Sequence, residues 1–150
     1  MRPHTKIAFW AVFCYTKIME NRKVKSRCIF IHENQILLCR DEKYDYYFFP
    51  GGSQTENETP EDTLRREIRE EFGSEVYNIK ILEMLKNSGQ NSDETIAMFQ
   101  ASFSDPDIYL QSKIPLIDNP EIKAVWVPII DVKNRLIKIF PEHNYLQLIE

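Results

Sequence analysis

The order of apolar and polar positions predicts a pair of antiparallel strands early in the chain. Arg27–His32 (RCIFIH) and Gln35–Arg40 (QILLCR) are apolar runs, and Glu33-Asn34 between them is typical of a tight turn. A polar loop follows, and Tyr46–Phe49 returns to an apolar, aromatic pattern. We therefore expect a hairpin followed by a third strand, which ends at Pro50-Gly51-Gly52.

The second half of the chain alternates between strand-like and polar segments. Asn78–Lys86 and Glu94–Ser104 are predicted to be antiparallel strands joined by the polar turn Asn87–Asp93. Asp105–Pro120 is rich in Asp and Pro, and it predicts a loop long enough to form a functional rim. The remaining expected elements are a strand, a short helix or turn and a terminal helix, at Ile122–Val127, Pro128–Ile137 and Pro141–Ile149.

Between the two halves, the residues predict one helix from Pro60 to Phe72. Thr59 is a good N-cap residue, and proline suits the first helical position. Asp62, three residues after the cap, approximates a capping box. Gly73 most easily adopts the left-handed conformation that ends a helix.

This helix carries two stripes of different chemistry. At about 100° per residue, the apolar side chains fall on one face and three glutamates fall about a quarter turn away. Carboxylates gathered in this way repel each other, and a divalent cation such as Mg²⁺ or Mn²⁺ offsets the repulsion. A solvated acidic face is the alternative for an isolated helix. The apolar residues are Leu64, Ile68 and Phe72, and the acidic residues are Glu67, Glu70 and Glu71.

The stretch Phe49–Val76 resembles the signature of one enzyme family. Its residues follow the spacing G-x5-E-x7-R-E-U-x-E-E-x-G-U, where U is a bulky aliphatic residue, and eight of the nine specified positions match. The exception is Ser74, where an aliphatic residue is expected. The chain therefore resembles a Nudix (MutT-like) hydrolase. The matching residues are Gly52, Glu58, Arg66, Glu67, Ile68, Glu70, Glu71 and Gly73.

The resemblance implies a fold and a metal site. The fold is α/β, a Nudix-type α/β/α sandwich with a mixed β-sheet. Glu70 and Glu71 are expected to be the principal ligands of Mg²⁺ (or Mn²⁺), with Glu67 as a third ligand or as the base. The resemblance also implies a Glu58–Arg66 pair that ties the loop to the helix, and a metal-binding carbonyl at Gly51. Some relatives take the base from a late loop, where Asp118 and Glu121 are the acids here.

The implied reaction is hydrolysis of the diphosphate linkage in a nucleoside diphosphate joined to another group. A nucleoside triphosphate or modified nucleotide is the leading small-molecule substrate, and an ADP-sugar or a dinucleotide is the alternative. A non-catalytic nucleotide sensor and a structural scaffold are hypotheses of other classes; the complete set of box carboxylates disfavours both. Expected substrate contacts are Arg27 and Arg40 for phosphates, and Phe140, Glu142 and Asn144 for the base.

Composition limits the remaining possibilities. The 150 residues predict one domain at 25–150, after an N-terminal extension of uncertain role at 1–24. Net charge is −4, and residues 51–76 hold eight acidic and three basic side chains, so the acidity belongs to this stretch. No basic patch favours long nucleic acid as a partner. A homodimer is an expectation from the family.

Cysteine content and the N-terminal segment bear on the compartment. Three cysteines without C-x-x-C spacing predict a reducing cytoplasm. The apolar run Ile7–Tyr15 is too short to span a bilayer, so no membrane association is expected. Residues 1–18 have two interpretations. They form an extra strand or edge segment packed on the domain, or the protein starts at Met19.

Overall fold

The computed structural model describes residues 23–89 and 92–149. The expected N-terminal extension, including Ile7–Tyr15, therefore lies almost wholly outside the described residues. The elements in chain order are β1 (Lys23–Ile29), β2 (Ile31–His32), β3 (Gln35–Asp41), β4 (Gly51–Ser53), α2 (Pro60–Phe72), β5 (Val76–Gly89), β6 (Ser92–Phe103), the 3₁₀ helix η1 (Pro106–Leu110), β7 (Lys113–Pro115), β8 (Ile122–Pro128), α3 (Ile129–Lys133) and α4 (Leu146–Ile149).

The strands form two four-stranded sheets, with orders β4-β1-β6-β5 and β2-β3-β8-β7. β1 and β6 are parallel, whereas the other pairs, such as β5 with β6 and β3 with β8, are antiparallel. The first sheet is therefore mixed, and the predicted α/β class with a mixed sheet is confirmed.

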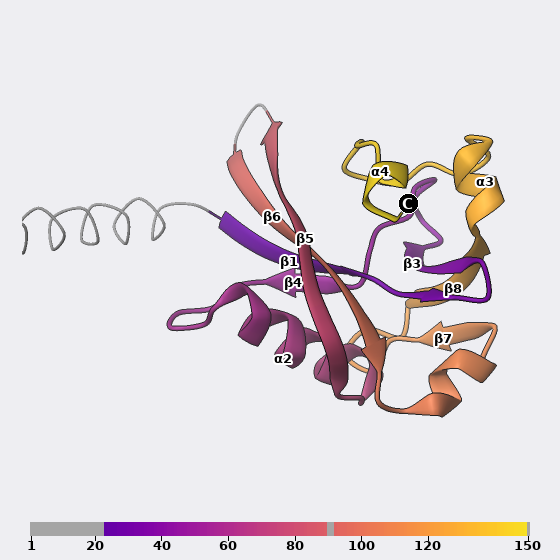
Figure 1. Ribbon diagram of the computed structural model, residues 1–150, viewed down its shortest axis with the longest axis horizontal. Helices are drawn as coiled ribbons and strands as arrows, with labels where there is room; N and C mark the ends of the chain where they lie inside the picture. The colour runs from indigo at the N-terminus through magenta and orange to yellow at the C-terminus, as the bar shows by residue number, and fades with distance from the viewer. Residues whose placement is uncertain (1–22, 90–91, 150) are drawn as a thin grey trace, which may run out of the picture.

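Side chains along the central strands point alternately to opposite sides, and an apolar core lies on each side of these strands. Cys28 of β1 packs in the same core as the apolar stripe of α2, whereas Ile29 packs in the second core with partly buried residues of α3 and α4. Figure 1 shows α2 apart from α3 and α4, with strands between them. Full burial of one large aliphatic side chain stabilises a fold by about 1.5–3 kcal/mol, so both faces contribute.

Helix α2 forms as its local sequence predicts. The Thr59 hydroxyl accepts from the Asp62 N–H at 3.1 Å, and the Asp62 carboxylate accepts from the Thr59 N–H at 3.1 Å. Gly73 ends the helix with a φ of 68°. The stripe of Leu64, Ile68 and Phe72 is buried. The predicted bounds, the capping box and the buried face are all confirmed.

Two predictions around the glycines and the later hairpin need correction. Tyr46–Phe49 makes only isolated bridges, at Tyr47 and Phe48, and the strand here is β4, which contains the glycines. The polar run Asn87–Asp93 is mostly strand, because β5 and β6 stay paired as far as Gly89 and Ser92. Backbone pairing with a neighbouring strand outweighs the weak β-propensity of these residues.

Two predictions in the C-terminal third also need correction. Asp105–Pro120 is not a continuous loop, since it contains η1 and β7. The terminal helix is only Leu146–Ile149, and Pro141–Tyr145 before it is irregular. Tyr145 is instead buried against Phe49, with ring centroids 4.8 Å apart.

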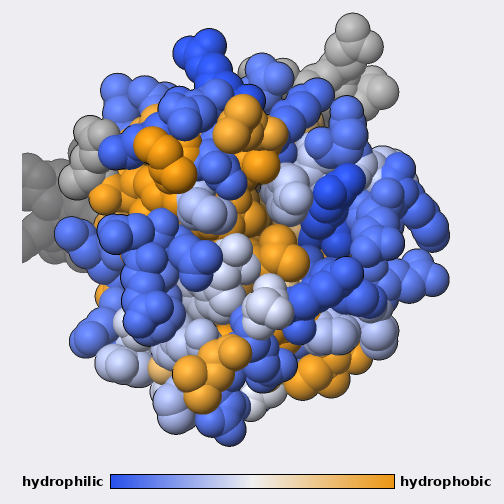
Figure 2. All heavy atoms as spheres, turned by 90° about the vertical axis from the view of Figure 1, so that its right-hand side faces the viewer, coloured by the Kyte–Doolittle hydropathy of each residue, from blue (hydrophilic) through white to orange (hydrophobic). Residues whose placement is uncertain are grey.

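No helix among the described residues is long and apolar enough to cross a membrane. Figure 2 shows the end of the molecule on the right of Figure 1, where apolar surface forms separate patches among polar side chains. Exposed large apolar side chains of the C-terminal third include Ile130 and Leu136.

Candidate active site

The glycine strand β4 lies between β1 and the acidic helix. Gly51 pairs with Arg27 of β1 and has a φ of 136°, a conformation that side chains rarely adopt. A Cβ at Gly51 would meet the backbone of Ser26, and a Cβ at Gly52 would meet the Glu67 carboxylate. Both glycines therefore bring backbone close to neighbouring groups, and the second leaves room for the Glu67 carboxylate.

Arg66 organises the acidic face of α2. Its guanidinium donates to Glu58 at 2.9 Å, to Glu67 at 3.0 Å and to Glu70 at 3.2 Å. It also donates to the Ser53 carbonyl at 2.9 Å, which ties the helix to β4. The bond from Arg66 lowers the pKa of Glu58 to about 2. The implied Glu58–Arg66 pair is present.

Three carboxylates converge beside this pair. Glu67, Glu70 and Asp118 each place an oxygen within 4.8 Å of the others. Asp118 belongs to the segment between β7 and β8, which is anchored where the Ile117 N–H donates to the Glu71 carbonyl at 2.8 Å. Such an all-oxygen donor set suits a hard cation such as Mg²⁺ or Mn²⁺. Of the two expected loop acids, Asp118 reaches the cluster, whereas Glu121 pairs with Lys43 at 3.4 Å.

Glu71 differs sharply from its neighbours on the helix. Its residue surface is 4% exposed, and Oε1 accepts from the Gly51 N–H at 3.0 Å. Burial raises the pKa of Glu71 to about 8, and the positive charge of Arg27 opposes that rise. Burial also raises the pKa of Glu67, against the effect of Arg66. The predicted stripe of three glutamates therefore divides into two acids in the cluster and one buried acid beside β4.

The two arginines expected at substrate phosphates have different surroundings. Arg27 donates to the carbonyls of Phe49 and Gly51 at 3.0 and 3.1 Å, so it lies beside the glycine strand. Arg40 donates to the Tyr44 carbonyl at 3.3 Å and lies 5.3 Å from the Tyr47 ring. Arg27 therefore adjoins the candidate metal site, whereas the Arg40 side chain contacts the loop that follows β3.

A pocket of about 240 Å³ lies next to Arg27. Phe140 lines it and is 50% exposed, and its ring centroid is 5.5 Å from that of Tyr46. Glu142 and Asn144 are exposed and lie outside its lining. The lining residues are Lys25, Arg27, Tyr46, Phe48, Phe49, Glu94, Ile96, Met98, Phe140, Pro141 and Tyr145.

The sequence did not identify Lys25, Tyr46 and Glu94 as residues of this pocket. Lys25 and Glu94 come together only because β1 and β6 pair in parallel, which joins segments about seventy residues apart. One local signal was present: Lys25 and Arg27 alternate with the buried residues Val24 and Ser26. That alternation places both cations on one face of the strand.

A family model described as the NUDIX domain matches residues 22–147. Over 54 residues, the chain is 35% identical to the 8-oxo-dGTP diphosphatase of Proteus vulgaris, a match that covers 36% of this chain and 48% of that protein. Over 48 residues, it is 44% identical to the RNA pyrophosphohydrolase of Pseudomonas savastanoi pv. phaseolicola, covering 32% and 30%. The chain thus spans half or less of the length of these curated relatives.

A solved structure extends the likeness to most of the fold. The MutT protein of Bacillus halodurans matches with a TM-score of 0.60 at 22% identity, covering 77% of this chain and 74% of that one. At this identity, the match shows a shared fold.

Proposed function

The chain belongs to the NUDIX domain family, and from this premise we propose that it is a metal-dependent pyrophosphohydrolase. It cleaves the diphosphate linkage of a nucleoside diphosphate joined to another group, with a nucleoside triphosphate or modified nucleotide as the leading substrate. One observation carries the proposal: carboxylates from α2 and from the β7–β8 segment converge beside β4, next to a pocket with aromatic walls.

The donor set fits Mg²⁺ or Mn²⁺. Glu67, Glu70 and Asp118 would hold the cation, with ionised Glu71 as a further ligand. The Gly51 carbonyl remains the proposed backbone ligand, and because a carbonyl has two lone pairs, its bond from Arg27 leaves one free. When bound, the cation would neutralise phosphate charge and lower the pKa of a coordinated water.

The side chains of the site then have separate tasks. Arg66 keeps Glu67 and Glu70 oriented through its ion pairs and is itself held by Glu58. Glu67 is the proposed third ligand or general base, since burial raises its pKa and so improves proton acceptance. Arg27 offers a positive charge to a substrate phosphate, because it lines the pocket, is held by the Gly51 carbonyl and acts electrostatically on Glu71.

The aromatic pocket is the proposed seat of the nucleobase. Phe140 lines the pocket and is half exposed, so we propose that its ring stacks on the base. The relative from Proteus vulgaris bears the name of a nucleotide diphosphatase, which supports a nucleoside triphosphate as the substrate class. Cys28 and Cys39 are buried and free, in keeping with the proposed cytoplasmic location; a homodimer remains a family expectation.

A substrate panel tests the proposal. Nucleoside triphosphates, oxidised nucleotides, ADP-ribose, nucleotide sugars and dinucleoside polyphosphates are incubated with Mg²⁺ or Mn²⁺, and the products are separated and identified. We expect turnover of at least one nucleotide, and we expect Glu71→Gln to abolish it without unfolding the protein. Glu75→Gln is the matched control, because Glu75 is exposed and pairs with Arg69 at 2.7 Å.

Two outcomes would contradict the assignment. Retained activity of Glu71→Gln with normal Mg²⁺ dependence would remove Glu71 from the site. Absence of turnover across the panel, with nucleotide binding confirmed by calorimetry, would replace the enzyme with a nucleotide sensor.

A further inference from the structure

The wall of the aromatic pocket contains a charge pair. Lys25 Nζ lies 2.8 Å from Glu94 Oε1, and the two side chains are 29% and 14% exposed. Lys25 comes from β1 and Glu94 from the neighbouring parallel strand β6. Further along β6, Ile96 and Met98 line the same pocket and are buried. Lys25 and Glu94 thus lie, together with Arg27, in a lining that is otherwise largely apolar and aromatic.

Stability gives little reason for a charge pair at this position. Partial burial removes part of the hydration of both charges, which opposes their attraction, and well-packed apolar residues often replace buried pairs without loss of stability. Ile96 and Met98 show that this face of β6 accommodates large apolar side chains. The position of the pair in the pocket lining instead suits contact with a ligand in the pocket.

The pair keeps hydrogen-bonding capacity that its contacts do not use. An ammonium has three donors, and a carboxylate has about four acceptor positions. Glu94 accepts from Lys25 and from the Asn87 side chain, and these bonds lower its pKa against the effect of burial. The ammonium of Lys25 can only donate hydrogen bonds, and the carboxylate of Glu94 directly beside it can only accept them. A complementary ligand therefore presents a hydrogen-bond acceptor to Lys25 and neighbouring donors to Glu94.

We propose that Lys25 and Glu94 are specificity-determining residues that recognise the base edge of a guanine nucleotide. This rests on the proposed function, which places a nucleobase in the pocket. Guanine presents the O6 acceptor beside two donors, N1–H and the 2-amino group. Glu94 accepts from both donors, and Lys25 donates to O6. Adenine and cytosine offer only an amino donor, and uracil only one N–H, so none of them engages both carboxylate oxygens.

Binding of nucleoside monophosphates tests this assignment without relying on hydrolysis. GMP and IMP share O6 and N1–H and differ only in the 2-amino group. By titration calorimetry, we expect wild type to bind GMP about tenfold or more tightly than IMP, as for one hydrogen bond to a charged group. Glu94→Gln should bring the GMP:IMP affinity ratio close to one. Lys25→Met should weaken both nucleotides equally, because both present O6.

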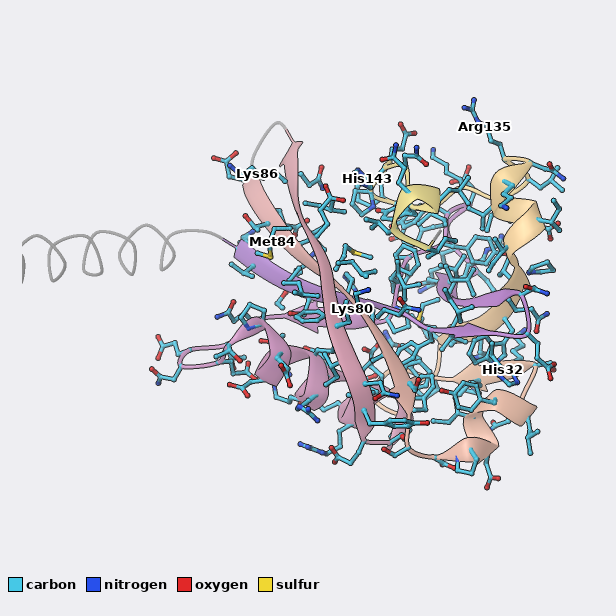
Figure 3. The ribbon with its side chains drawn as sticks, in the orientation of Figure 1. His32, Lys80, Met84, Lys86, Arg135 and His143 are labelled. Atoms are coloured by element: carbon cyan, nitrogen blue, oxygen red, sulfur yellow. The ribbon has the colours of Figure 1, made fainter. Side chains whose placement is uncertain are left out.

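A matched control and a charge swap separate recognition from a structural role. Lys80→Met removes an exposed lysine of β5 outside the pocket lining, and it should change neither affinity (Figure 3). The double variant Lys25→Glu/Glu94→Lys keeps an ion pair but exchanges donor and acceptor. If the pair recognises the base, the folded double variant should lose the preference for GMP over IMP. If the pair is purely structural, the restored ion pair should restore that preference, and this outcome would overturn the proposal.

The two proposals fail in different ways. Wild type that turns over nucleotides but binds GMP and IMP equally, or binds neither, would refute the role of Lys25 and Glu94 alone. Wild type that prefers GMP but hydrolyses nothing in the panel would leave the recognition intact and refute the proposed reaction.

Discussion

The carboxyl group of Glu71 is almost fully buried, whereas Glu70, one position earlier on α2, is exposed. The difference comes from β4, whose Gly51 N–H donates to Glu71 at 3.0 Å. Burial raises the pKa of Glu71 to about 8, so much of this acid is protonated near neutral pH when no cation is bound. A neighbouring cation would favour the ionised form, so metal binding should release a proton here.

This burial predicts how stability depends on pH. The folded state holds a proton on Glu71 up to about pH 8, whereas the unfolded chain releases it near the ordinary value of 4.5. The wild type therefore loses stability relative to Glu71→Gln as pH rises from about 4.5 to 8, by up to about 1.4 kcal/mol per pH unit. Below pH 4.5 and above pH 8, the difference in unfolding free energy between wild type and Glu71→Gln does not change with pH. Urea denaturation in EDTA at several pH values measures it.

The control for this prediction is Glu75→Gln. The bond from Arg69 lowers the pKa of Glu75, so its stabilising contribution is complete above its ordinary value and does not change from pH 5 to 8. A stability difference between wild type and Glu71→Gln that stays flat from pH 5 to 8 would contradict the buried carboxyl.

At the scale of elements, β4 and α2 form one unit in which two adjacent glycines have different tasks. Gly51 has a φ of 136°, and its added Cβ would meet the Ser26 backbone, which cannot easily move. Gly52 has no such positive φ, and the nearest atoms that its added Cβ would meet belong to the carboxylate of Glu67, a side chain that can move. The first glycine is therefore a requirement of the fold, and the second is a requirement of the site.

Alanine substitutions separate these requirements. Gly52→Ala should retain its thermal stability but displace Glu67, so that Mg²⁺ affinity falls about tenfold or more and turnover falls with it. Gly51→Ala should lose about 1–3 kcal/mol or more of unfolding free energy from backbone strain. Thermal unfolding and calorimetric Mg²⁺ titration of both variants test this. Equal effects of the two substitutions on stability and on Mg²⁺ affinity would contradict the division.

The helix shows what local sequence predicts well. Thr59, Asp62 and Gly73 act on the backbone within a few residues, so the ends of α2 follow from the sequence alone. The burial of Glu71 does not follow, because it depends on a strand twenty residues earlier. Glu67, Glu70 and Glu71 are the same residue type on one helix, and their different contacts with β4, Arg66 and Asp118 become visible only in the fold.

At the scale of the whole molecule, distant segments meet around two neighbouring sites. The acidic cluster combines α2 with Asp118, which is held by the contact from Ile117 to the end of the helix. The pocket combines β1, β6 and the irregular segment before α4. Sequence reasoning named Asp118 and Phe140 by residue type, but only the strand pairing and chain path show which groups lie next to them. The terminal helix is shorter than predicted, because Tyr145 packs on Phe49 instead of continuing a helical turn.

Because the pocket and the acidic cluster use different parts of the chain, a change in the pocket should spare metal binding. Phe140→Ala removes a half-exposed ring from the pocket edge. Loss of one base–aromatic stack corresponds to about 1–3 kcal/mol, so KM for a nucleotide substrate should rise about 5-fold to 150-fold. Mg²⁺ affinity and the midpoint of thermal unfolding should stay close to wild type. Steady-state kinetics and calorimetric Mg²⁺ titration measure the two effects separately.

Leu136→Ala is the control for Phe140→Ala, because Leu136 is 70% exposed on the same C-terminal segment and lies outside the pocket lining. It should leave both KM and Mg²⁺ affinity unchanged. If Phe140→Ala weakened Mg²⁺ binding as much as nucleotide binding, the two sites would not be independent, and the ring would act through the fold. If KM stayed at the wild-type value, Phe140 would lie outside the substrate site, and the base would contact other walls of the pocket.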